Sequence, residues 1–484
     1  MALATAKRPG LFITRSIDAL AAETREAAGP RLRRALGPWA LIAIGLGNMI
    51  GAGIFATIGD GVHDKAGPAV IVSFLLAGIA CAFAALCYAE ISSMVPLAGS
   101  AYTYTYATLG ELIAWIIGWD LILEYGISAA PVASTLSQNI QSAFSAGNIH
   151  LPLWLATART SDTPHGAFDL LAFLAVLAFS GLLAIGVRES AATNSGLVIA
   201  KMVILSAFVI IGIHFIHPAN WQPFSPFGFH GIIQGAFTVF FAFIGFDAVT
   251  TAAEEAKNPQ RDVPWGVLGA LGLGAIFYVA IALVLTGMQP TKDISVGTPL
   301  STALIAVHLP GWAYVMNVGA IFATISVILT SLFGQSRIFY VMARDGMLPK
   351  GVSKIHPRFR TPARMTMITG FFVALLAGFV PLDTLLSLVN IGTFGAFMLV
   401  CVGVIVLRRT QPQRERRFRA PLVPLVPVLG VLLSLFLIFY GSGWLVWVRF
   451  AVWLIIGLVI YFGYSYRHSE ARKALAAAQP GVGS

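Results

Sequence analysis

Two long apolar stretches of this 484-residue chain are interrupted by glycine and polar residues where a membrane helix would normally be most regular. They are residues 45–55 (GLGNMIGAGIF) and 241–250 (FAFIGFDAVT). Inside a bilayer, non-helical backbone is tolerated only where it is buried in protein or lines a water-filled cavity. One interrupted segment in each half of a chain indicates a secondary transporter's binding site. The sequence therefore predicts a protein that moves a small polar solute across a membrane.

The composition predicts an all-α integral membrane protein. The chain is 57% hydrophobic and only 11% charged, and apolar runs of about 20 residues recur along it. Reading these runs predicts twelve spans, at residues 38–60, 68–95, 108–140, 168–187, 194–216, 231–254, 264–288, 311–336, 364–380, 384–407, 423–440 and 443–463.

The positions of the two interruptions predict an internal repeat. The first opens span 1 and the second opens span 6, so five spans form each repeat and two remain outside. Inverted repeats often survive only as such weak hydropathy symmetry. The predicted division is an N-terminal tail (1–37), a transporter domain (38–463) and a C-terminal tail (464–484). Within the domain, repeat one covers about 38–216, repeat two about 231–407, and the two extra helices about 423–463.

The net charge of +10 reports topology rather than a nucleic-acid partner. If the N-terminus is cytoplasmic, most of the 31 Lys and Arg residues fall on the inner side. The outer side receives Lys65, Arg159, Lys292 and Arg449. This asymmetry follows the positive-inside rule and predicts two cytoplasmic termini in the inner membrane, with the basic face against anionic lipid.

Other chemistries find no support in the sequence. Cys81, Cys87 and Cys401 lie within predicted spans, at spacings that suit neither a metal site nor an external disulfide. We find no phosphate-binding glycine loop and no arrangement of a hydrolase. We therefore predict no enzyme activity, no metal and no cofactor apart from a coupling proton.

The interruption of span 1 can bind a carboxylate. If the helix unwinds, the half-helix that follows presents unpaired backbone N–H groups and the positive end of its dipole. The candidate residues are Ile50, Gly51, Ala52 and Gly53. The alternative is close helix packing through a GxxxG pair, Gly47 and Gly51. The density of glycine, with Asn48 among the glycines, favours unwinding.

The interruption of span 6 can bind an ammonium group. Gly245 permits the break, and the half-helix before it then exposes carbonyl oxygens. The candidate carbonyls are those of Phe241, Ala242, Phe243 and Ile244. Asp247 places a carboxylate two residues further on. An acid within the membrane is costly and indicates function, although it could instead hold the broken helix by a structural hydrogen bond or ion pair.

Two more ionisable residues lie inside spans. Lys201 is in span 5, and a desolvated ammonium there can exchange a proton at an accessible pH; the alternative is snorkelling to the inner interface. Glu124 lies deep in span 3 and would pair with Lys201 or with substrate. Ser326 in span 8 could help line a proton site or be an ordinary helix serine. Glu90, near the end of span 2, is expected to make a structural cap or an inner-gate contact.

Four sequence motifs resemble the cationic amino acid transporter family of the amino acid–polyamine–organocation superfamily. They are GLGNMIGAGIF in span 1, CYAEISSMVPLAGSAYTYTYATLGELIAWIIGWDLILEY across spans 2 and 3, FFAFIGFDAVTTAAEEAKNPQRDVP in span 6 and GQSRIFYVMARDGMLP after span 8. The resemblance extends over nearly the whole chain. Twelve spans are similar to the bacterial members.

The resemblance implies the five-plus-five inverted-repeat fold, with an amino acid bound between spans 1, 3, 6 and 8. Gly51, Ala52 and Gly53 would meet the substrate carboxylate, and the backbone of residues 241–244 its ammonium. Lys201 would occupy the place of a sodium site, which implies proton coupling. Glu124 and Asp247 would be the acidic pair nearby. Ala52 stands where relatives can carry a hydroxyl residue, and selectivity for cationic side chains does not follow from the family name.

These observations lead to a predicted function, a proton-coupled L-amino acid symporter that works by alternating access. An amino acid exchanger is the alternative within the same class, and a non-transporting amino acid sensor is the alternative from another class. The expected partners are the L-amino acid and membrane lipid, and no nucleic acid. The sequence does not indicate whether a small membrane subunit binds to the protein.

Overall fold

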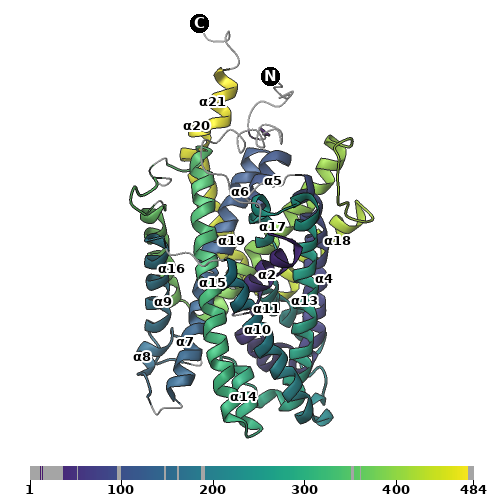
Figure 1. The fold of residues 1–484 in the computed structure, drawn as a ribbon, viewed down its shortest axis with the longest axis vertical. Coiled ribbons are helices and arrows are strands. Elements are labelled where there is room, and N and C mark those ends of the chain that lie inside the picture. Colours follow the sequence, from purple (N-terminus) through teal and green to yellow (C-terminus); the bar gives the residue numbers. More distant parts are fainter. Residues whose placement is uncertain are drawn as a thin grey trace.

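The computed structural model describes residues 11, 13–14, 36–51, 53–94, 100–145, 149–160, 163–186, 191–349, 351, 354–359 and 361–477. The regular elements among these residues are helices, most of which run along the long axis of the molecule (Figure 1). The extended pairing recorded in this part of the chain is a single parallel bridge between Leu36 and Ala256.

The first half of the chain contains the elements of the first predicted repeat. These are α2 (Pro38–Met49), η1 (Gly53–Thr57), α3 (Ile58–Asp60), η2 (Gly61–Ala66), η3 (Gly67–Ala69), α4 (Val70–Met94), α5 (Ser100–Thr108), α6 (Glu111–Leu121), η4 (Ile122–Ile127), α7 (Ala129–Ser145), α8 (Leu153–Ala156), α9 (Leu170–Ala184), α10 (Ala191–Gly212) and η5 (Ile213–Phe215).

The second half follows after η6 (Pro218–Trp221). It contains α11 (Gly228–Val239), η7 (Phe240–Phe243), α12 (Ala248–Thr251), η8 (Ala253–Glu255), α13 (Pro259–Met288), η9 (Thr291–Asp293), α14 (Pro299–Ala306), α15 (Pro310–Arg344), α16 (Ala363–Phe379), α17 (Leu382–Thr410), α18 (Leu425–Gly441), α19 (Trp444–Ile460), η10 (Tyr461–Ser465), α20 (Tyr466–His468) and α21 (Glu470–Ala477).

Local chemistry explains where several helices begin. Proline occupies the first turn of α2, α13, α14 and α15, where its missing N–H costs no helical hydrogen bond. Asp169 caps α9, since its carboxylate accepts from the N–H of Ala172 at 3.0 Å. Helix α13 begins at Pro259, five residues before the predicted span 7, and α15 continues to Arg344, past the predicted end at 336. The first extension (PQRDV) is polar, so hydropathy alone does not assign it to a helix, and the second (RIFYVMAR) has an arginine at each end.

Eight helical stretches of the described residues are long and apolar enough to cross a membrane, and α2, α9, α16 and α18 are shorter apolar helices. Each of the twelve predicted spans overlaps helix. The fold is therefore helical and of membrane-protein type, as predicted. The count of twelve crossings, the inverted repeat and the division into tails and repeats stay predictions.

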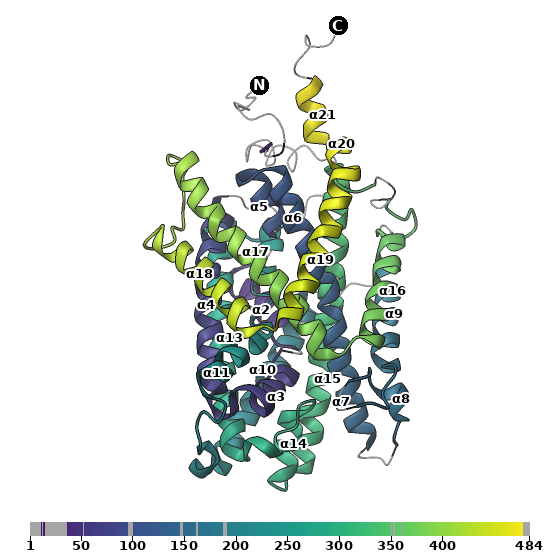
Figure 2. The same cartoon turned by 180° about the vertical axis from the view of Figure 1, so that it is seen from behind.

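Helices distant in sequence pack closely. Helix α4 lies along α13, α9 along α16, and α7 along α15 (Figures 1 and 2). At Gly370 of α16, a Cβ atom would come 2.0 Å from the Ser180 hydroxyl oxygen of α9. Small residues permit such approach between membrane helices.

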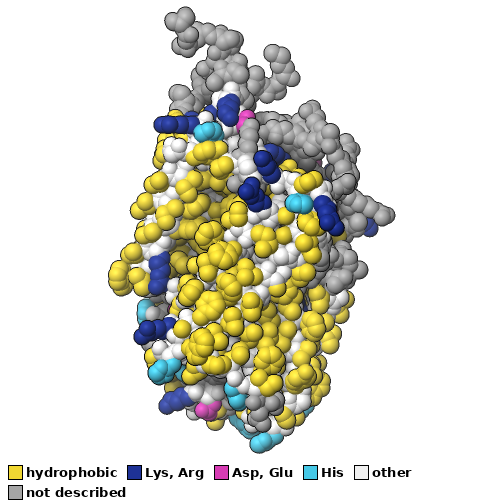
Figure 3. Space-filling view, turned by 90° about the vertical axis from the view of Figure 1, so that its left-hand side faces the viewer, with side chains coloured by type: hydrophobic (Ala, Val, Ile, Leu, Met, Phe, Trp, Pro, Cys, Tyr) yellow, Lys and Arg dark blue, Asp and Glu magenta, His cyan; other side chains and the backbone are white. Residues whose placement is uncertain are grey.

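The outer surface of the bundle is apolar. On the face drawn in Figure 3, hydrophobic side chains cover the middle, and most charged ones lie toward the ends. Exposed large side chains include Ile210, Ile276, Phe372, Phe439 and Val459. An apolar band of this kind fits contact with lipid tails.

One end of the molecule carries both α5 and the C-terminal helices (Figure 1). Helix α5 is enclosed at this end of the bundle, and the side chains of its residues 101–107 are buried. Beside it, the buried Glu111 carboxylate accepts from Arg472 Nε at 2.7 Å and from the Tyr461 hydroxyl at 2.9 Å. These bonds hold α21 against the start of α6.

Candidate functional site

The first predicted interruption is present in the structure. Helix α2 ends at Met49, Ile50 has an extended backbone, and helical structure resumes at Gly53. The predicted candidate Ala52 lies outside the described residues. The helix that resumes is a π-helical turn, which is typical of functional sites.

The second predicted interruption is also present. Helix α11 ends at Val239, a 3₁₀ turn covers Phe240–Phe243, and α12 begins at Ala248. Gly245 has φ = +112°, which residues with a side chain rarely adopt. The break between the two half-helices therefore depends on glycine at this position.

The two interruptions face each other. A Cβ atom on Gly53 would lie 2.3 Å from Cα of Ala242, and one on Gly245 would lie 2.8 Å from Cβ of Asn48. Backbone of one broken helix thus touches backbone of the other. The glycines are required here for close approach.

A small cavity of about 40 Å³ lies beside the facing breaks, with room for about three water molecules. Its walls come from span 1 (Asn48, Met49, Gly51, Gly53), span 3 (Glu124, Tyr125, Ser128, Val132), span 6 (Phe241, Ile244, Gly245, Asp247, Ala248) and span 8 (Val327, Ser331). The candidates Ile50, Ala242 and Phe243 are buried nearby but do not line it. The structure thus brings together the four spans named in the prediction.

Lys201 lies inside the bundle, only 2% exposed. Its Nζ donates to the Ser326 hydroxyl at 2.7 Å and to the carbonyl of Gly47 at 3.0 Å. Gly47 belongs to the last turn of α2, immediately before the first break, so this amine joins α10 to α2 and α15. Snorkelling to the interface, the alternative left open by the sequence, does not describe this geometry.

The acidic pair is Glu124 and Asp247. No donor among the described residues reaches either Glu124 oxygen. The Glu124 carboxyl lies against that of Asp247, the acidic pair that the family resemblance implies, whereas the residues alone suggested Lys201 or substrate as its partner. Two carboxyl groups hydrogen-bond to each other only with a proton between them. The pair is therefore suited to hold a proton or the ammonium group of a substrate.

Helix geometry places Glu124 in the cavity. It lies in η4, a π-helical segment in the middle of span 3 where the sequence predicts a regular helix. Within the same segment, the Tyr125 hydroxyl donates to Asp247 Oδ2 at 2.9 Å. Sequence reasoning missed Tyr125, because nothing in the sequence marks the π-helical turn that presents both residues.

A second residue that sequence reasoning missed is Tyr278 of α13. Its hydroxyl donates to the carbonyl of Ala242 at 2.8 Å, and the carbonyl of Phe241 accepts from the N–H of Ile244 at 3.2 Å. Two of the four carbonyls predicted to meet an ammonium are thus already bonded within the protein. Tyr278 instead holds the broken backbone of span 6 in place.

We expect Tyr278→Phe to lower the free energy of unfolding by about 1–3 kcal/mol, because it leaves the buried Ala242 carbonyl without its donor. The initial rate of uptake should fall with it. The measurements are the thermal midpoint of the purified protein and uptake into proteoliposomes. Tyr440→Phe is the control, since Tyr440 is 58% exposed on α18. Equal midpoints for the two variants would contradict the role given to Tyr278.

Comparison with known proteins gives the family. The amino acid permease family profile matches residues 36–464. The chain is 44% identical to the methylthioribose transporter of Bacillus subtilis (strain 168), over 84% of this chain and 88% of the relative. It is 46% identical to the branched-chain amino acid permease BcaP of the same organism, over 84% of this chain and 87% of the relative. It is 39% identical to the vacuolar cationic amino acid transporter 4 of Arabidopsis thaliana, over 72% and 59%.

Apolar helices of membrane length, packed around two facing helix breaks, define a multi-pass membrane protein of the transporter class. The chain belongs to the amino acid permease family, within the amino acid–polyamine–organocation superfamily predicted from its motifs. This is a family of transporters rather than of enzymes.

Proposed function

We propose that this protein is a proton-coupled symporter of neutral aliphatic L-amino acids that works by alternating access. The observation that carries the proposal is the contact between the two helix breaks beside a cavity that also contains a buried acidic pair. A free amino acid has a charge at each end, and the two breaks offer N–H groups and carbonyl groups to those charges.

The substrate carboxylate would meet the N–H groups at Gly51 and Gly53, where α2 has ended. The ammonium would meet the carbonyl of Ile244, for which no bond is found among the described residues, together with the Glu124–Asp247 pair. The cavity must widen to admit a substrate, since it now has room for about three water molecules. Alternating access supplies such a change in shape.

The remaining walls of the cavity favour an uncharged aliphatic side chain. Met49, Val132, Phe241, Ile244 and Val327 are apolar, and Ser128 and Ser331 are small. Relatives named branched-chain amino acid permease, from Bacillus subtilis and Lactococcus lactis, are 46% and 34% identical to this chain. A methylthioribose substrate is the second candidate, on the 44% identity reported above. It has no ammonium for the acidic pair.

Proton coupling rests on Lys201 and on the acidic pair. In its protonated form Lys201 ties α10 and α15 to the last turn of α2. Loss of that proton would weaken the bonds and favour a different arrangement of α2. The positive-inside distribution of basic residues supports cytoplasmic termini in the inner membrane.

A thermal-shift screen of the purified protein tests the substrate class, because a ligand of the folded state raises its stability by about 2.7 kcal/mol at a hundred times its Kd. We expect leucine, isoleucine and valine to raise the midpoint, and arginine, lysine and methylthioribose to leave it unchanged. A shift with methylthioribose alone would overturn the amino acid proposal. Uptake that requires internal amino acid would identify an exchanger, and saturable binding without flux would identify a sensor.

A further inference from the structure

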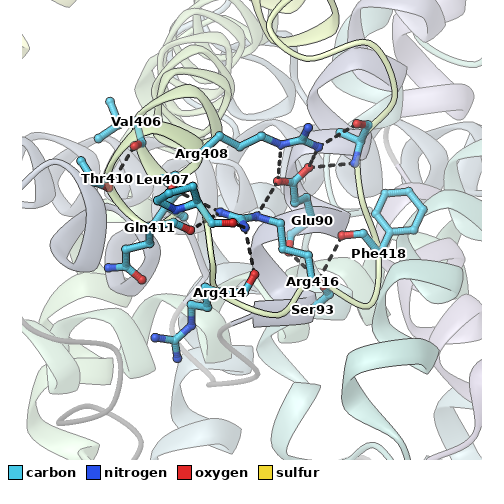
Figure 4. A network of polar contacts seen from close by, with 12 residues as sticks. Glu90, Ser93, Val406, Leu407, Arg408, Thr410, Gln411, Arg414, Arg416 and Phe418 are labelled. Carbon is cyan, nitrogen blue, oxygen red and sulfur yellow. Dashed lines mark hydrogen bonds and ion pairs between the residues drawn. The ribbon is translucent and has the colours of Figure 1, made fainter.

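Residues at both ends of the loop between α17 and α18 donate hydrogen bonds to one buried carboxylate, that of Glu90 near the end of α4 (Figure 4). Arg408 donates from Nε to Glu90 Oε1 at 2.9 Å and from Nη2 to Oε2 at 2.7 Å. The backbone N–H of Ala420 donates to the same Oε2 at 2.8 Å. Both ends of the loop are thus held by a side chain that is fully buried. Of the two roles expected for Glu90, the structural one matches these contacts.

The interior of the loop is filled by Arg416, only 8% exposed. Its Nη2 donates to Leu407 and Gln411 carbonyls at 3.2 and 2.8 Å, and its Nη1 donates to Pro412 and Arg414 carbonyls at 3.1 and 2.9 Å. Carbonyls at a helix C-terminus lack helical partners. The loop therefore wraps around one guanidinium group in a fixed conformation.

Positive charge exceeds negative charge in the 408–419 loop, a name that here includes the last turn of α17. Residues 408–419 contain Arg408, Arg409, Arg414, Arg416, Arg417 and Arg419. The facing carboxylates are Glu90 and Glu415, and Glu415 is 84% exposed at 3.8 Å from Arg417. Burial lowers the pKa of Arg416. The negative charge of Glu90 raises this pKa, and the positive charges of Arg408 and Arg419 lower it. Six arginines in this segment thus face two carboxylates.

The loop also lies next to exposed apolar side chains. It is at the outer edge of the bundle, beside α18 (Figure 2). Leu422 and Leu425, at the start of this apolar helix, are 73% and 52% exposed. Exposed leucines next to exposed arginines fit an interface between lipid tails and headgroups.

We propose that the 408–419 loop binds the phosphate headgroup of an anionic phospholipid through Arg409, Arg417 and Arg419. All three side chains are exposed, and guanidinium groups bind phosphate oxygens in bidentate geometry. Glu90, Arg408 and Arg416 are positioning residues, because they fix the loop and leave these three arginines facing outward.

Native mass spectrometry of the full-length purified protein tests the site, with phosphatidylglycerol and phosphatidylcholine as probes. We expect the wild type to bind phosphatidylglycerol at least tenfold more tightly than it binds phosphatidylcholine. The Arg409→Gln/Arg417→Gln/Arg419→Gln variant should lose about tenfold to a hundredfold of this affinity, since each basic residue near an anionic headgroup contributes a several-fold factor. The matched control is Lys354→Gln/Arg358→Gln/Arg364→Gln, which removes three exposed charges at and before the start of α16.

The control variant should bind phosphatidylglycerol within twofold of the wild type. Equal losses in the two triple variants would show nonspecific attraction and would overturn the proposal, as would unchanged binding by the loop variant. Displacement of phosphatidylglycerol by millimolar inorganic phosphate would identify a site for free anions and would also overturn it. Unchanged thermal midpoints of both variants would support direct loss of lipid contacts.

Discussion

Replacement of Lys201 by methionine is expected to reduce uptake driven by a proton gradient at least tenfold while substrate binding stays within about threefold of the wild type. Methionine has a similar volume and leaves no large cavity. It cannot carry the charge that now meets Ser326 and the carbonyl of Gly47. The measurements are proteoliposome uptake with and without an inward proton gradient, and ligand-induced thermal shifts.

Lys201→Arg serves as the control for charge, because a guanidinium keeps its proton at all accessible pH values. If proton exchange is what matters, both variants lose gradient-driven uptake. If only a fixed positive charge matters, the arginine variant keeps gradient-driven uptake. Gradient-driven uptake by Lys201→Met equal to that of the wild type would refute the coupling role.

Replacement of Gly53 by alanine is expected to abolish uptake and to lower the free energy of unfolding by about 1–3 kcal/mol. The new methyl group would lie 2.3 Å from Cα of Ala242 and 3.0 Å from its backbone nitrogen. Backbone atoms cannot turn away as a flexible side chain can, so the two broken helices must separate. Thermal midpoints and uptake rates measure both effects.

The matched control is Gly272→Ala in α13, where no atom lies within 4 Å of the added Cβ. Helix propensity favours alanine at such a position by about 1 kcal/mol, so this variant should be as stable as the wild type or more stable. A Gly53→Ala protein with normal uptake and midpoint would contradict the facing arrangement of the two breaks.

The interrupted helices could be predicted because their signal is local. Glycine in an apolar run weakens the helix wherever the run is placed, and both predicted breaks are present at Ile50–Gly51 and at Ile244–Gly245. The roles predicted for Lys201, Ser326, Glu124 and Asp247 stay predictions, although the structure brings Lys201 to Ser326 and Glu124 to Asp247.

By itself, the sequence determined that the chain is a helical membrane protein with two breaks, and its motifs indicated the family. Only the tertiary structure decided which faces meet: Lys201 with Gly47, Tyr278 with Ala242 and Glu90 with the 408–419 loop. The physical reason is that membrane spans such as α4 are apolar on nearly every side, so their hydrophobic pattern does not fix their rotation. Close packing between distant helices fixes that rotation and sets these contacts.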